Sequence, residues 1–129
     1  MSDKSFKILI VENNQNVALD LKQILGFHKY TITGTFHSGI DVINEIKKTS
    51  PDLLIYSLLI ADSKSLDSII YYQKRYRFRI IFLAGSFELK HYGSKLKSDL
   101  IFFLKKPYSS SELLSLVEKS LNVKKNNHL

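Results

Sequence analysis

Short apolar runs recur along the chain, and none of them alternates apolar with polar positions. Runs of roughly four to eight apolar residues are typical of parallel strands that are buried on both faces of a sheet. Four segments fit this description: Ile8–Val11, Leu53–Ile60, Arg79–Ala84 and Leu100–Leu104. A fifth segment, Thr31–Phe36, is β-branched and aromatic and contains Gly34, which favours an edge strand. The hydrophobic pattern therefore predicts five strands.

The segments between these runs carry the spacing of amphipathic helices. Val17, Leu21 and Leu25 recur along one helical face, and Gly26 can end that helix. Shorter versions of the pattern lie around residues 42–46, 66–70 and, more weakly, 89–96. The last helix has the clearest start, because Ser109 and Glu112 have the spacing of a capping box, in which each side chain bonds a free backbone amide. One helix is thus predicted after each strand.

This alternation of strand and helix predicts an α/β fold with right-handed crossovers. Five strands favour a flavodoxin-like (βα)5 arrangement, a doubly wound parallel sheet in the order 2-1-3-4-5 between two helical layers. Residues 1–121 are expected to form a single domain, and residues 122–129 a polar C-terminal tail that is too hydrophilic to pack. Any site should lie outside the carboxyl ends of the strands.

Composition narrows the class of protein. The chain has 129 residues, a hydrophobic fraction of 44% and no cysteine. Disulfides and thiolate metal sites are therefore excluded, and no apolar run approaches the roughly 18 residues that cross a bilayer. The first residues contain no apolar segment of the kind found in a secretory signal. We expect a cytoplasmic protein with no membrane partner.

The formal net charge of +7 favours anionic partners such as nucleic acid or acidic proteins. Part of this charge is interleaved with aromatic residues, in a segment that contains Tyr71, Tyr72, Lys74, Arg75, Tyr76 and Arg77. Such a mixture can bind single-stranded nucleic acid. Two other interpretations stay open: the basic residues can form a solvated surface, and the tyrosines can cover the edge of the core with their hydroxyls in water.

Candidate site positions lie at or near the ends of the predicted strands. They are Glu12, Asn13, Ser57, Ala84, Phe103, Lys106 and Pro107. The four histidines show no metal-ligand spacing, and neither a phosphate-binding glycine loop nor a nucleophile beside a base is found. We therefore expect no catalytic residue, no metal site and no enzyme activity.

These segments resemble the receiver domains of bacterial two-component response regulators over residues 6–121. Lys7–Glu12 is similar to the family's first strand and the start of its acidic pair, and Phe103–Tyr108 to its lysine–proline corner. Pro51–Ile60 resembles the third strand, in which the sixth residue after the proline is the aspartate that accepts a phosphoryl group. That position is Ser57 in this chain. The resemblance implies a signalling fold whose phosphoacceptor is missing, that is, a degenerate pseudo-receiver.

The chain departs from the family pattern at the positions that bind the metal ion and the phosphoryl group. The second acid, which binds Mg²⁺ in the family, is Asn13 here, and the Ser/Thr that senses the phosphoryl group is Ala84. Glu12 and Lys106 are retained. Because Mg²⁺ prefers carboxylate oxygens, we expect no Mg²⁺ binding, no other cofactor and no phosphotransfer to Ser57.

Lys106 needs a counter-charge if it faces a partly covered pocket. An ion pair with Glu12 is predicted. The alternative is that Lys106 and the backbone amides after Glu12 bind a free anion such as sulfate. The Lys106–Pro107 peptide bond is expected to be cis, as in the family.

We expect a stand-alone, atypical receiver domain that acts in signal transduction by binding proteins, without the usual aspartyl phosphorylation. In the family the phosphoryl signal passes through the positions of Ala84 and Phe103, and neither residue has a hydroxyl. Expected partners are proteins of a signalling pathway, or a second copy of the chain bound through the helix at 89–96, the strand at 100–104 and the helix after Ser109. Two alternatives stay open: a basic nucleic-acid-binding protein, and residual phosphorylation at a non-aspartyl position such as Ser57 or at Asp62.

Overall fold

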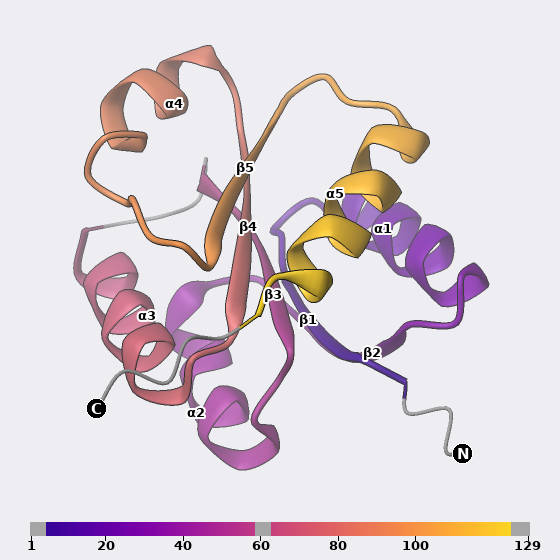
Figure 1. Ribbon diagram of the computed structural model, residues 1–129, viewed down its shortest axis with the longest axis horizontal. Coiled ribbons are helices and arrows are strands. Elements are labelled where there is room, and N and C mark those ends of the chain that lie inside the picture. Colours follow the sequence, from indigo (N-terminus) through magenta and orange to yellow (C-terminus); the bar gives the residue numbers. More distant parts are fainter. Residues whose placement is uncertain (1–4, 59–62, 125–129) are drawn as a thin grey trace.

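The structure is a computed structural model that describes residues 5–58 and 63–124. Within these residues five strands alternate with five helices (Figure 1). The strands are β1 (Lys7–Val11), β2 (Thr31–Phe36), β3 (Leu53–Ser57), β4 (Arg79–Ala84) and β5 (Ile101–Lys105). The helices are α1 (Gln15–Phe27), α2 (Gly39–Thr49), α3 (Ser63–Tyr76), α4 (Ser86–Tyr92) and α5 (Ser110–Asn122). The predicted alternation is confirmed.

All neighbouring strands are parallel, and the sheet has the order β2-β1-β3-β4-β5. The flavodoxin-like, doubly wound architecture is therefore confirmed, with β2 at one edge as predicted. β3 ends at Ser57, earlier than the predicted end at Ile60. Residues 59–62, which include Ile60 and Asp62, lie outside the described residues.

Helices cover both faces of the sheet. Figure 1 shows α1 and α5 on one face and α2, α3 and α4 on the other. Leu9 and Val11 of β1 pack into the core under α2 and α3, whereas Ile8 and Ile10 pack into the core under α1 and α5. Successive side chains of a strand point to opposite faces, so a strand that is apolar throughout needs a helical layer on each side. No helix within the described residues is long and apolar enough to span a bilayer.

The helix ends differ from the sequence prediction in two places. α1 continues past Gly26 to Phe27, and the chain turns at Lys29, whose φ is 69°. α4 ends at Tyr92, although Leu96 beyond it is still buried. The predicted start of α5 is confirmed: Ser109 Oγ accepts the Glu112 N–H at 3.1 Å, and Glu112 Oε1 accepts the Ser109 N–H at 2.9 Å.

Candidate functional site

The carboxylate of Glu12 lies buried where β1 ends. The Glu12 N–H donates to Phe36 O at 2.9 Å, which fixes the backbone beside the end of β2. The side chain is 4% exposed, and its Oε2 accepts the Asn14 N–H at 3.1 Å. The other oxygen, Oε1, is buried and has no hydrogen-bond partner within the described residues. Asn13, the next residue, is exposed to solvent.

Ser57 and Lys106 meet at the same edge of the sheet. Ser57 is the last residue of β3 and is fully buried. Lys106 follows β5, and its N–H donates to Ala84 O at 2.8 Å. Its side chain reaches back across β4, and Lys106 Nζ donates to Ser57 Oγ at 3.2 Å. The lysine therefore has a neutral hydroxyl as its partner where the family pattern has a carboxylate.

The predicted ion pair between Glu12 and Lys106 is wrong. No contact of 4.0 Å or less joins the two charged groups, since Lys106 Nζ bonds Ser57 and one Glu12 oxygen is unpaired. The strand order favours Ser57 over Glu12 as the partner. Adjacent strands lie about 4.8 Å apart, so the end of β3 is roughly 10 Å from the end of β5, and the end of β1 is roughly 14 Å away. Lys106 Nζ bonds the nearer residue, Ser57. The Lys106–Pro107 bond is cis, as predicted.

Ala84 and Phe103 lie beside this pair without adding a polar group. Ala84 ends β4 and is 1% exposed. Phe103 is half-buried, and its ring lies 5.6 Å from that of Phe82. Phe82 in turn makes an edge-on contact with Tyr56 at 5.9 Å. Ala84, Phe103 and Phe82 therefore supply apolar side chains beside the Ser57–Lys106 pair.

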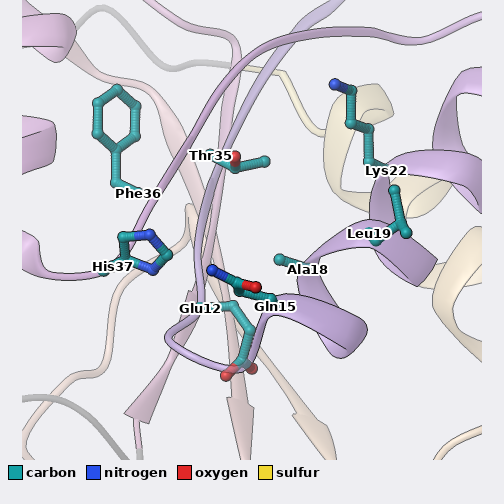
Figure 2. A pocket seen from close by; sticks show the side chains of 8 residues that line it. All are labelled: Glu12, Gln15, Ala18, Leu19, Lys22, Thr35, Phe36 and His37. Atoms are coloured by element: carbon teal, nitrogen blue, oxygen red, sulfur yellow. The ribbon is translucent and has the colours of Figure 1, made fainter.

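A pocket adjoins Glu12 between α1 and the end of β2. This pocket has a volume of about 270 Å³, and its polar lining includes Gln15, Lys22, Thr35 and His37 (Figure 2). Figure 2 shows the Glu12 carboxylate directed away from Lys22 and Thr35, toward the carboxyl ends of the strands. Lys22 therefore does not neutralise the buried carboxylate.

Sequence reasoning missed Tyr108, which lies close to the acidic side chains of this edge. Tyr108 is half-buried and lines a groove together with Lys106, Pro107 and α1 residues such as Asp20. Burial raises the pKa of the Tyr108 phenol above 10.0, and the negative charges of Glu12 and Asp20 raise it further. Its position directly after the lysine–proline pair was the available signal.

The raised pKa of Tyr108 predicts a pH effect on stability. A group whose pKa is higher in the folded state contributes stability below its unfolded pKa and loses it as pH rises toward the folded value. We expect the free energy of unfolding of the wild type to fall more steeply than that of Tyr108→Phe between about pH 9 and pH 11. Urea unfolding at each pH measures this difference. Tyr71→Phe, which changes a tyrosine that is 60% exposed, is the matched control, and equal slopes for all three proteins contradict the prediction.

Within residues 5–58 and 63–124, no group of three or more histidine, aspartate or glutamate side chains is arranged to hold a metal ion. At this edge Glu12 supplies a buried carboxylate, Asn13 is exposed and the Ser57 hydroxyl is bonded to Lys106. Lys106 places a positive charge in the same region.

Comparisons with known proteins agree with this architecture. A family model described as the response regulator receiver domain matches residues 8–118. The receiver domain of the PhyR response regulator from Erythrobacter litoralis is similar in structure, with a TM-score of 0.80, 17% identity, and coverage of 97% of this chain and 96% of that one. A response regulator receiver protein from Sinorhizobium medicae has a TM-score of 0.76, 20% identity, and coverage of 94% and 98%.

A third similar structure is the signal receiver domain of a putative Luxo repressor protein from Vibrio parahaemolyticus, with a TM-score of 0.74, 23% identity, and coverage of 92% of this chain and 91% of that one. No curated protein sequence matches the chain. At such low identities the structural likenesses show the fold, while the family model spans most of the sequence, including every strand of the sheet except the first residue of β1. The chain belongs to the family of response regulator receiver domains.

Proposed function

We propose that this chain acts in the cytoplasm as an atypical receiver domain that binds protein partners without phosphorylation at the usual aspartyl position. The observation that carries this proposal is the state of Ser57. Its hydroxyl is buried at the end of β3 and accepts a hydrogen bond from Lys106 at 3.2 Å. A hydroxyl without an adjacent base is a weak nucleophile, and the described contacts of Ser57 supply a lysine instead of a base.

The residues of this edge do not fit a Mg²⁺ ion. Mg²⁺ takes oxygen ligands in a strict octahedral geometry and favours carboxylates. Of the family's acidic positions this chain keeps Glu12, while Asn13 and Ser57 are neutral. The Lys106 ammonium lowers the negative potential further. We therefore infer that no divalent ion is held here and that the domain is not an enzyme.

The switch positions support a domain that stays in one state. Ala84 presents a methyl group that cannot bond a phosphoryl oxygen, and it is almost fully buried. Phe103 packs against Phe82 and has no hydroxyl to exchange between solvent and protein. Without a bistable element, a ligand has no second conformation to select. The surface built by α4, β5 and α5 is therefore proposed to be constitutively available.

Phe87 on α4 makes that surface a candidate for protein contact or for a homodimer. Its ring is 76% exposed and stacks on His91 with 2° between the ring planes. Exposed aromatic rings are enriched among the residues that dominate protein interfaces. Sedimentation of the wild type and of Phe87→Ala tests the homodimer, which the variant should weaken.

The main experiment adds beryllofluoride or acetyl phosphate with Mg²⁺ to isotope-labelled protein and follows the amide spectrum. We expect no change at residues 57, 84 and 106, because neither metal nor phosphoryl analogue is held. Saturable shifts at those residues overturn the proposal. Mass spectrometry of the same samples tests the alternative of residual phosphorylation: a phosphoryl group on Ser57 or Asp62 would favour it.

A further inference from the structure

Two exposed tyrosines, Tyr71 and Tyr76, and the half-buried Tyr72 lie with two cations where α2 meets α3. The two helices lie side by side on one face of the sheet (Figure 1). The surface along their seam is formed by Lys47, Tyr71, Tyr72, Arg75 and Tyr76, and we call it the tyrosine–cation surface. It is separate from the α4–β5–α5 surface, so the inference below does not depend on the proposed function.

The side chains of the tyrosine–cation surface hold one another in place. Lys47 Nζ lies 5.0 Å from the ring centre of Tyr72, and the Arg75 guanidinium 6.0 Å from that of Tyr76. The rings of Tyr72 and Tyr76 stack at 6.1 Å with 18° between their planes, and Tyr71 meets Tyr72 edge-on at 5.1 Å. Cations held over aromatic faces are partly ordered before any ligand arrives, which lowers the entropy lost on binding.

The positive charge of this surface is not compensated locally. Lys47 and Arg75 are exposed, and neither forms an ion pair with another described residue. Glu45 precedes Lys47 by two positions, so it points roughly 200° around α2, away from the seam. Asp67, the nearest acid along α3, lies two turns before Arg75, about 12 Å along the helix axis, and forms no ion pair with it. The surface therefore suits an anionic ligand.

The exposed ring of Tyr71 favours an anionic ligand that also has a flat aromatic group to stack on it. Tyr71 is 60% exposed and Tyr76 37%. We propose that the tyrosine–cation surface binds single-stranded nucleic acid, with Lys47 and Arg75 on phosphates and the Tyr71 ring on a base. Single strands offer both phosphates and free base faces, and base–aromatic stacking tolerates any sequence. In a duplex the base faces are stacked and cannot contact the ring. Binding to an anionic membrane depends more on the insertion of apolar side chains than on phenols.

The test measures fluorescence anisotropy of labelled single strands of about 12 nucleotides at about 50 mM salt. Tyr71→Ala is expected to raise Kd roughly 5- to 150-fold, whereas Tyr71→Phe retains the stacking face and the affinity. Replacing both Lys47 and Arg75 by alanine should make the slope of log K against log salt shallower by about 1.4, because two phosphate contacts are lost. Circular dichroism confirms that each variant is folded.

The matched control is the double variant Lys22→Ala/Phe27→Ala, which removes one exposed cation and one exposed ring (Phe27 is 87% exposed) elsewhere. This control should bind like the wild type. The proposal is overturned if the wild type shows no saturable binding at about 50 mM salt, or if the control loses as much affinity as Tyr71→Ala. Equal affinity for a duplex or an abasic strand, or binding to anionic vesicles in place of oligonucleotides, also overturns it.

Discussion

The double variant Asn13→Asp/Ser57→Asp is expected to bind Mg²⁺ and beryllofluoride, although we expect the wild type to bind neither. The two substitutions add carboxylates beside Glu12 and change the formal charge of the edge from about 0 to about −2, with Lys106 included. Each added carboxylate contributes attraction of order 4 kcal/mol to a unit charge at about 4 Å in an effective dielectric of about 20. Isothermal titration with Mg²⁺, followed by amide spectra with beryllofluoride, measures the gain.

The single variant Ser57→Asp is the control for this experiment. Its carboxylate would stand where Lys106 Nζ now donates to a hydroxyl at 3.2 Å. An ion pair with Lys106 is therefore expected to form first, leaving little affinity for Mg²⁺. In the double variant the shifts should stay near residues 57 and 106 and leave Phe103 unchanged, because Ala84 cannot bond the added group. If the folded double variant fails to bind Mg²⁺, the missing side chains are not what prevents metal binding.

The central strands could be predicted because their burial is uniform. β3 and β4 are buried at every position, whereas β2 and β5, which lie at the two edges of the sheet, have exposed positions. Local pattern was a weaker guide to helix ends. Leu96 follows the apolar spacing of the α4 segment and is buried, yet the helix stops at Tyr92, so the side chain reaches the core from a turn. Spacing predicts which side chains are buried more reliably than the backbone conformation that buries them.

The sequence predicted where the site residues lie better than it predicted which of them contact one another. Glu12, Ser57 and Lys106 do lie at the carboxyl edge of the sheet, as the strand ends require. Their partners depend on distances between strands that are far apart in sequence. Complementary charge suggested Glu12 for Lys106, whereas the sheet order placed Ser57 within reach. The role of Tyr108 was missed for the same reason, since its neighbour Asp20 comes from α1.

Phe82→Ala is expected to lower the free energy of unfolding by about 3–5 kcal/mol, the usual cost of deleting a buried phenyl ring. Phe82 is fully buried in β4 and contacts the rings of Tyr56 and Phe103. Domains of this size are commonly stable by about 5–15 kcal/mol, so the change removes a large part of the total. Guanidinium chloride unfolding, monitored by circular dichroism, measures the free energy of unfolding of the wild type and of the variant.

Phe27→Ala is the matched control, because its ring is 87% exposed and its loss should change stability by no more than about 0.5 kcal/mol. Similar losses in the two variants would contradict the burial argument. Phe82→Leu adds a graded test, since leucine refills part of the cavity and should cost less than alanine. The ring centre of Phe103 lies 5.6 Å from that of Phe82. A cavity there would therefore free Phe103 to move, and amide shifts in β5 and α4 of the leucine variant would show how far the proposed interaction surface depends on this aromatic packing.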